Sequence, residues 1–143
     1  MSFQIHKQLL TDTHYIGKLA VCHVLLNKNA LLPWFILVPE ATAHDLLDLP
    51  ATEREIVMDE CAEISVWIKQ YFNLSKMNFG AIGNIVPQLH LHVIGRSEKD
   101  ICWPKPVWGN LESFKDYSTN EIKSIKQQLI SRYKLVAEND PGC

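Results

Sequence analysis

Polar and apolar residues alternate with a strict period of two from residue 87 to residue 93 of this 143-residue chain, and the apolar Ile94 follows. As a β-strand, the stretch would place three polar side chains on one face, those of Gln88, His90 and His92. Positions two residues apart on a strand are separated by roughly 6.6 Å, so neighbouring side chains can reach one phosphate-sized group above the middle position. The pattern therefore predicts a functional site centred on His90.

Hydrophobic patterning elsewhere predicts the other strands of an antiparallel sheet. Residues 15–26 are apolar on both faces, which predicts one long strand that is central or packed at an interface. We expect His23, among these apolar neighbours, to be a buried histidine with satisfied hydrogen bonds rather than a catalytic one. A strand over residues 34–38 ends at a proline, and a strand over residues 76–82 leads through a short turn into the His90 strand.

Two helices are predicted from capping boxes and helical spacing. Residues 52–55 form a capping box, and apolar residues then repeat at helical spacing down to Phe72, as in one long amphipathic helix packed on the sheet. Asn73 is its expected stop. A second box at residues 118–121 opens a C-terminal helix, expected over about 119–136, and Asp140-Pro141-Gly142 follows as its end. These elements together predict an α+β domain.

Composition narrows the class of protein. With 143 residues and 47% hydrophobic content, we expect a single domain with its own core, over residues 1–143. Fourteen basic and sixteen acidic residues occur without long runs of either sign, which does not indicate binding to nucleic acid. The apolar run at 30–39 is too short for a membrane span, and the N-terminus lacks the apolar core of a signal peptide. We therefore expect a soluble, cytoplasmic protein with no membrane partner.

The histidine pair allows three interpretations. Neutral imidazole is a nucleophile near pH 7, and a second imidazole can donate or accept a proton, so the pair suits attack on a phosphoryl centre. An alternating strand can also be an amphipathic strand with its histidines facing water. The third interpretation is a metal-dependent hydrolase in which His90, His92 and either His44 or Cys102 hold the ion. Because no spaced third ligand accompanies the two histidines, we expect no metal and no other cofactor.

Residues 88–94 resemble the signature of the histidine triad (HIT) family, with glutamine in place of the first histidine. Residues 34–39 are similar to the family's hydrophobic strand ending in proline, and Trp103-Pro104 is similar to the Trp-Pro near its C-terminus. Gly83-Asn84 matches a Gly-polar turn that contacts phosphate. The resemblance covers about residues 20–108, is closest to a bacterial HIT-like branch with glutamine at the first position, and implies a HIT-like fold of about five strands that usually forms a homodimer.

The resemblance also implies a hydrolase or transferase acting at the α-phosphate of a nucleotide conjugate. Nε2 of His90 would attack phosphorus to form a nucleotidyl-histidine, with the proton on Nδ1 held by a backbone acceptor near His92. His92 and the Asn84 turn would stabilise the phosphate oxygens. Gln88 can donate a hydrogen bond but cannot titrate, so slow hydrolysis, group transfer or a leaving group that needs no proton are compatible.

Three further positions enter as candidate substrate-binding residues. The family places an acidic residue on the ribose hydroxyls near the end of its first long strand, where this chain offers only Asn27 or Asn29, and the choice stays open. His44 lies near the position of another family active-site histidine, and is equally well explained as a loop or helix-start residue. Trp103 belongs to a tail that packs beside the active site or across a dimer in related proteins.

A second hypothesis comes from a different class of function. The chain would be a nucleotide-binding sensor or scaffold dimer with little turnover. Gln88 and the missing acidic residue favour this hypothesis, whereas the retention of His90 and His92 on one face counts against it.

Overall fold

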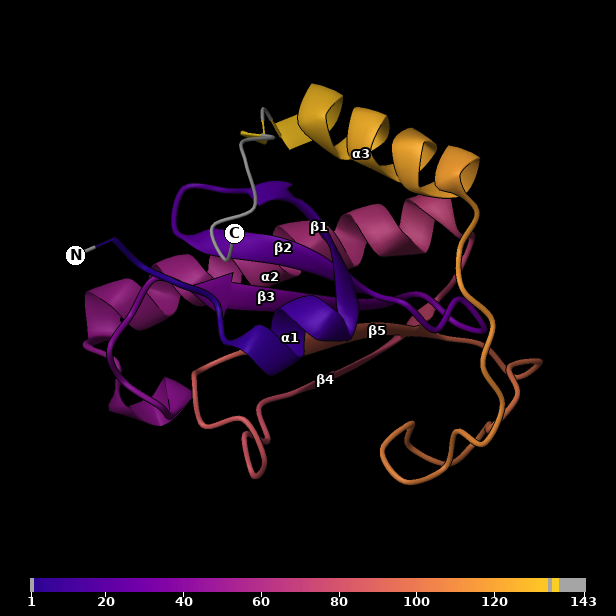
Figure 1. The fold of residues 1–143 in the computed structure, drawn as a ribbon, viewed down its shortest axis with the longest axis horizontal. Coiled ribbons are helices and arrows are strands. Elements are labelled where there is room, and N and C mark those ends of the chain that lie inside the picture. The colour runs from indigo at the N-terminus through magenta and orange to yellow at the C-terminus, as the bar shows by residue number, and fades with distance from the viewer. Residues whose placement is uncertain (1, 134, 137–143) are drawn as a thin grey trace.

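The computed structural model describes residues 2–133 and 135–136, and its core is a five-stranded antiparallel sheet. The strands lie in the order β1-β2-β3-β5-β4 (Figure 1). Their bounds are β1 Thr13–Lys18, β2 Cys22–Asn27, β3 Trp34–Pro39, β4 Lys76–Gly80 and β5 Leu91–Arg96. The α+β prediction is confirmed.

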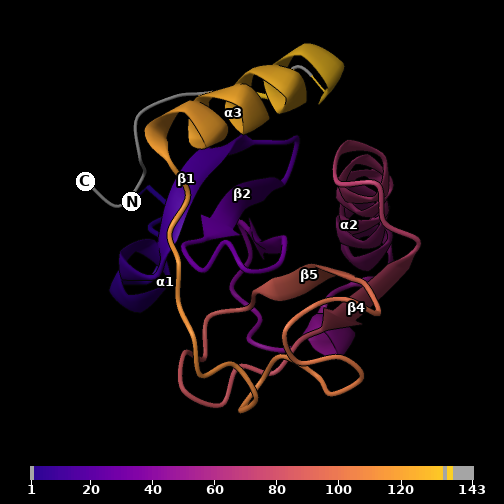
Figure 2. The ribbon, with the colours of Figure 1, turned by 90° about the vertical axis from the view of Figure 1, so that its right-hand side faces the viewer.

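Helices cover both faces of the sheet. On one face, α2 (Ala51–Tyr71) packs against β5 and β4, and α3 (Thr119–Tyr133) packs against β1 (Figure 2). The short helix α1 (Lys7–Thr11) contacts the opposite face, where the N-terminal segment also runs. A 3₁₀ turn, η1 (Leu46–Asp48), precedes α2. None of the described helices is long and apolar enough to span a bilayer.

The central strands are covered on both sides, which explains why they are apolar on both faces. The main core lies between the sheet and helices α2 and α3, and includes Val24, Leu37, Ile64 and Leu129. A second cluster on the opposite face joins the N-terminal segment to β2, β3 and the loop before β5; it consists of Ile5, Leu9, Leu25, Ile36, Val38 and Val86. This second cluster forms one boundary of the cavity described below.

The prediction of one long strand over residues 15–26 is wrong, because the chain turns back at residues 19–21. Leu19 N donates to Cys22 O at 2.9 Å and closes a hairpin between β1 and β2. The backbone N–H groups of Val21 and Cys22 donate to the buried carboxylate of Glu60 in α2, at 3.1 and 2.8 Å. The turn is thus stabilised by a residue almost 40 positions away and carries no Gly, Pro or Asn of its own.

The His90 strand is also shorter than predicted. The β4 strand ends at Gly80, β5 begins only at Leu91, and residues 81–90 form a loop instead of a short turn. The ladder with β3 ends at the pair Leu37–Leu91, and the ladder with β4 ends at Gly80–His92. Because residues 88–90 have no strand partner, nothing forces their side chains to keep the alternation.

The start of α2 differs from the prediction. The helix begins at Ala51 after Pro50, and no side chain caps it, so the box expected at residues 52–55 does not form. Pro50 is its N-cap residue, and the guanidinium of Arg54 donates to Leu49 O at 2.9 Å, before the helix starts. The predicted stop is confirmed, because Asn73 follows the helix with φ +54°.

The capping box of α3 is confirmed. Ser118 N donates to Glu121 Oε1 at 2.8 Å, and Glu121 N donates to Ser118 Oγ at 3.1 Å. The helix ends at Tyr133, three residues before the expected end, and residues 140–142 lie outside the described residues.

His23 is buried with both ring nitrogens hydrogen-bonded, as predicted. Nδ1 lies 2.8 Å from Tyr15 Oη, and Nε2 donates to Glu40 Oε1 at 2.8 Å. Its ring stacks on Phe3 with 5.5 Å between centroids. His23 therefore anchors the N-terminal segment to the sheet.

Candidate active site

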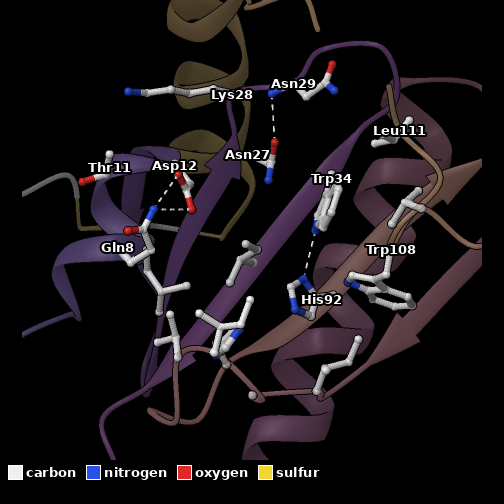
Figure 3. A pocket seen from close by; sticks show the side chains of 18 of the residues that line it. Gln8, Thr11, Asp12, Asn27, Lys28, Asn29, Trp34, His92, Trp108 and Leu111 are labelled. Atoms are coloured by element: carbon white, nitrogen blue, oxygen red, sulfur yellow. Dashed lines mark hydrogen bonds between the residues drawn. The ribbon is translucent and has the colours of Figure 1, made fainter. Parts of the chain in front are cut away.

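A cavity of about 840 Å³ opens on the face of the sheet opposite α2 (Figure 3). This is within the usual size range of small-molecule sites. Strands β2, β3 and β5 supply its floor, and α1, loop 81–90 and the segment from residue 107 to 114 supply its walls. Its chemically informative lining residues are Gln8, Asp12, Asn27, Lys28, Trp34, Asn84, His90, His92 and Trp108.

The register of the strands gives the cavity two ends. His92 pairs with Ile36 of β3, and Leu26 of β2 pairs with Phe35, which places Asn27 beside Trp34. Asn27 thus lies two strands away from His92 across the sheet and two residues away along the strand direction. Standard strand spacing and rise then give a separation of about 12 Å between the two positions. That distance suits a ligand with a phosphate at the histidine end and a sugar or base at the Asn27 end.

A backbone carbonyl fixes the orientation and tautomer of His90. Its side chain is 7% exposed, and Nδ1 lies 2.7 Å from the carbonyl oxygen of Gln88. Because a carbonyl only accepts, Nδ1 carries the proton and Nε2 keeps its lone pair. No described residue hydrogen-bonds Nε2, on a ring that lines the cavity. The expectation of an acceptor near His92 is wrong, since the acceptor is two residues before His90.

His92 has the opposite tautomer. Trp34 Nε1, which can only donate, gives a hydrogen bond to His92 Nδ1 at 3.0 Å, so the neutral ring carries its proton on Nε2 (Figure 3). Burial, reinforced by the neighbouring His90, lowers the pKa of His92 to about 4. At neutral pH, His92 is therefore an uncharged hydrogen-bond donor.

The two imidazoles and two tryptophans pack as one unit. The rings of His90 and His92 lie 5.0 Å apart at 71°, and the edge of Trp108 meets His92 at 5.3 Å. Trp108 also crosses Trp34 nearly perpendicularly. Gly80 permits this arrangement, because a Cβ there would come within 3.2 Å of the Trp108 ring. The packing fixes the orientation of His92.

The side chain of Gln88 points away from this unit. Its Oε1 accepts from His6 N at 2.7 Å and its Nε2 donates to Gln4 O at 2.9 Å, so the amide pairs with the N-terminal backbone as another peptide group would. Gln88 is not among the residues that line the cavity. The backbone of residue 88 thus serves His90, while its side chain holds the N-terminal segment.

The Gly83-Asn84 turn reaches the cavity, as expected. Gly83 adopts φ +64°, a conformation that glycine allows without strain, and both residues line the cavity with Ile82 and Ile85. Ile85 is 91% exposed. The turn therefore presents an amide side chain and backbone groups to the cavity that His90 also lines, from a loop with an apolar rim.

The structure distinguishes the two asparagines. Asn29 is buried and tied to the distant segment 113–115, with Nδ2 donating to Ser113 O at 2.9 Å. Asn27 Oδ1 accepts from Asn29 N at 2.9 Å, and no described residue accepts from Asn27 Nδ2. Both residues line the cavity, but Asn27 is the one with a free donor.

Asp12 is an acidic residue of the cavity that the sequence pattern missed. It precedes β1, which pairs Thr13 with Asn27, and its carbonyl accepts from Lys28 N at 3.0 Å. Its carboxylate accepts from Gln8 Nε2 at 3.0 Å. Its place in the cavity follows from the β1–β2 register, and a single strand over residues 15–26 would not produce that register. Trp34 and Trp108, in contrast, had no local signal beyond their aromatic character.

Two other candidates, His44 and Trp103, lie outside the cavity. His44 is exposed in the loop after β3, and Trp103 lines a separate, smaller hollow of about 330 Å³. Arg96, the last residue of β5, is 2% exposed, with its guanidinium hydrogen-bonded to Asp100 and Asn78 and packed against the Trp103 ring. Hydrogen bonding to Asp100 raises the pKa of Arg96.

The metal-site hypothesis gains no support from the side-chain positions. Cys102 lies against the guanidinium of Arg96 rather than beside His90 and His92. Within residues 2–133 and 135–136, no three His, Cys, Asp or Glu side chains are grouped to hold an ion. The thiols of Cys22, Cys61 and Cys102 are free and buried.

Known proteins resemble this chain in sequence and fold. Residues 8–99 match the model of the HIT domain. A histidine triad protein from Marinobacter aquaeolei VT8 is 37% identical with a TM-score of 0.85, over 92% of this chain and 96% of its own. One from Bradyrhizobium japonicum is 33% identical with a TM-score of 0.86, over 93% of this chain and 99% of its own. A third, from Sinorhizobium meliloti 1021, is 32% identical with a TM-score of 0.85, over 91% of this chain and 96% of its own.

One curated relative carries an enzyme name. It is the asymmetrical bis(5'-nucleosyl)-tetraphosphatase of Schizosaccharomyces pombe, 28% identical over 108 residues, which are 71% of this chain and 58% of the relative. The domain match covers more than half of the chain and includes His90, His92 and the Gly83-Asn84 turn. The chain therefore belongs to the HIT domain family.

Proposed function

We propose that this protein is a nucleotide hydrolase or nucleotidyltransferase that acts at the α-phosphorus of a nucleotide conjugate through a nucleotidyl-His90 intermediate. The observation that carries the proposal is the tautomer of His90. With its Nδ1 proton on the Gln88 carbonyl, the ring has its nucleophilic Nε2 available to the cavity it lines. The relative named as a bis(5'-nucleosyl)-tetraphosphatase supports a substrate that contains a nucleotide phosphoanhydride.

Each step has a residue suited to it. Nε2 of His90 forms a bond to phosphorus as the bond to the leaving group breaks, and the Nε2–H of His92 stabilises a non-bridging oxygen. Asn84 supplies further donors from the loop. Water or a second acceptor then attacks phosphorus, the P–N bond breaks with its electron pair returning to Nε2 of His90, and the proton lost by the attacking group passes to solvent. These steps use no metal or cofactor.

The other end of the cavity suits a ribose. Asn27 offers a free amide donor and Asp12 a carboxylate, so a diol could donate to the carboxylate and accept from the amide. The carboxylate that the sequence lacks at position 27 would thus come from the end of α1.

Intact-mass analysis with the 4-nitrophenyl ester of adenosine 5'-monophosphate tests the proposal. Wild-type protein should acquire one adenylyl group or release nitrophenol, and His90→Ala should do neither. His44→Ala is the matched control, because it removes an exposed histidine outside the cavity and should label like wild type. Equal labelling of His90→Ala and wild type would contradict the proposal.

A specific observation favours a second candidate, a nucleotide sensor or scaffold with little turnover. The side chain at the first signature position is committed to the N-terminal segment, so one potential catalytic group is absent from the cavity. Calorimetry would reveal tight binding of adenosine monophosphate without product from any conjugate if this candidate were correct. Turnover that depends on His90 would exclude it.

We also propose that the chain forms a homodimer. Strand β4 is an edge of the sheet, and Phe79 on it and Ile82 just beyond it are exposed, so the edge offers backbone groups and apolar area to a second copy. Light scattering during size-exclusion chromatography should give twice the 16.4 kDa chain mass. Phe79→Lys should return it to the monomer mass; a monomeric wild type would refute the proposal.

A further inference from the structure

The described side chains around His90 include no evident proton donor for a leaving group. Four titratable residues line the cavity among the described parts of the chain: Asp12, Lys28, His90 and His92. His90 is the nucleophile, and its own proton is held on the Gln88 carbonyl. The remaining three decide whether a departing group can be protonated.

His92 cannot fill this role near neutral pH. Its Nδ1 accepts from Trp34, so a second ring proton would have to displace that hydrogen bond. The neutral ring donates a hydrogen bond through Nε2–H but retains the proton. His92 therefore stabilises charge on phosphate oxygens without supplying a proton.

Gln88 cannot compensate. Both polar atoms of its amide are used by the backbone of Gln4 and His6. Histidine at this position could not reproduce both bonds, because its two nitrogens point in divergent directions, whereas an amide offers donor and acceptor side by side. The exposed ring of His6 lies outside the cavity, and its Nδ1 accepts from Gln8 N.

Asp12 and Lys28 lie at the Asn27 end of the cavity. Strand geometry separates Asn27 from His92 by about 12 Å, and Figure 3 shows the Lys28 side chain directed away from His92. Asp12 is also occupied by Gln8. Neither residue is placed to protonate an atom leaving the phosphorus that His90 attacks.

We infer that this site selects nucleotide conjugates whose leaving group departs as a stable anion, such as a phosphate or carboxylate joined to the α-phosphate as an anhydride, and discriminates against amines and alcohols. The inference rests on the proposed function, and it goes further by assigning the leaving-group class. In the step, the His90 lone pair forms the P–N bond and the P–O electron pair leaves on the anhydride oxygen. No proton moves until water hydrolyses the intermediate.

A series of adenosine 5'-aryl phosphate diesters tests the inference. The aryl groups should run from pentafluorophenyl through 4-nitrophenyl to phenyl and 4-methylphenyl, so that leaving-group acidity changes while the nucleotide stays constant. We expect kcat/KM to fall steeply along the series, by about 10²–10⁴, the factor that a general acid typically supplies. A flat dependence in wild type would overturn the inference.

Three variants test whether another residue acts as a general acid. The measured quantity is the dependence of kcat/KM on leaving-group acidity across the series, called its slope. Gln88→Leu, Asp12→Asn and Lys28→Met should each keep the wild-type slope, whatever their absolute rates. A variant that selectively loses the poorer leaving groups would identify an acid and overturn the inference. His90→Ala separates the two proposals: ester turnover that survives this change, or a wild type that shows neither an adenylyl adduct nor turnover, contradicts the proposed function itself.

Discussion

Gln88 and His92 lie two residues on either side of His90, yet they have different environments. His92 is within β5, paired with Ile36, buried and hydrogen-bonded by Trp34 at the floor of the cavity. Gln88 precedes the strand and pairs through its side chain with the N-terminal backbone. An alternating sequence therefore places side chains reliably on one face only where a strand ladder fixes the backbone.

The largest expected difference between the two positions is in catalysis. His92→Phe removes a neutral donor aimed at developing phosphate charge and should lower kcat by about 10²–10³. Stopped-flow measurement with the 4-nitrophenyl ester separates this effect from substrate binding. Gln88→Leu keeps the carbonyl that orients His90 and should cost much less. Equal losses in the two variants would show that the proposed division of roles is wrong.

Stability against pH gives the next largest effect. The pKa of His92 falls from 6.5 to about 4 on folding, so between these values the unfolded chain binds a proton that the native protein excludes. The native state should therefore lose up to about 3 kcal/mol of unfolding free energy as the pH drops from 7 to 4. Urea denaturation of wild type and His92→Phe at both pH values measures it. The same pH dependence in both proteins would contradict this assignment.

Removing the Gln88 amide should affect the N-terminal segment more than the cavity. Gln88→Leu loses two hydrogen bonds at a partly exposed site, a cost of about 1 kcal/mol. The amide of His6 should exchange faster with deuterium, which peptide-resolved mass spectrometry detects. Gln127→Met on exposed α3 is the matched control and should leave His6 protected. Unchanged protection in Gln88→Leu would refute the anchoring role.

The smallest predicted effect concerns the tautomer of His92. Trp34→Phe deletes the donor that favours the neutral ring, so the pKa of His92 should rise by up to about one unit. NMR titration of the histidine ring protons measures the shift. Trp103→Phe is the control, because the indole ring that it replaces packs against Arg96; it should leave the pKa of His92 unchanged. A shift in the control but not in Trp34→Phe would disprove the assignment.

The parts of the fold that depend on local sequence were predictable. The stop at Asn73, the capping box at Ser118 and the burial of His23 follow from local chemistry, as do the overall α+β class and the cavity positions of His92 and the Gly83-Asn84 turn. In these cases, the groups that determine the conformation or burial of the residue are near it in the sequence, or its burial follows from its apolar neighbours.

The remaining parts depend on long-range contacts. The turn before β2 is held by Glu60 from α2, and the Gln88 side chain is directed by a segment more than 80 positions earlier. Asp12 enters the cavity only through the β1–β2 register, and Trp34 reaches His92 only because β3 pairs with β5. No local pattern encodes such pairs, so the orientation of Gln88 and the carboxylate at the Asn27 end could not be derived from spacing.

The stereochemical course at phosphorus tests the central claim, a covalent intermediate on His90, most directly. The 4-nitrophenyl ester of adenosine 5'-phosphorothioate, prepared as a single diastereomer at phosphorus, would be hydrolysed in ¹⁸O-labelled water and the product configuration determined. Each in-line displacement inverts phosphorus, so attack by His90 followed by attack by water predicts overall retention. Overall inversion would mean that water attacks the substrate directly, and would contradict the account.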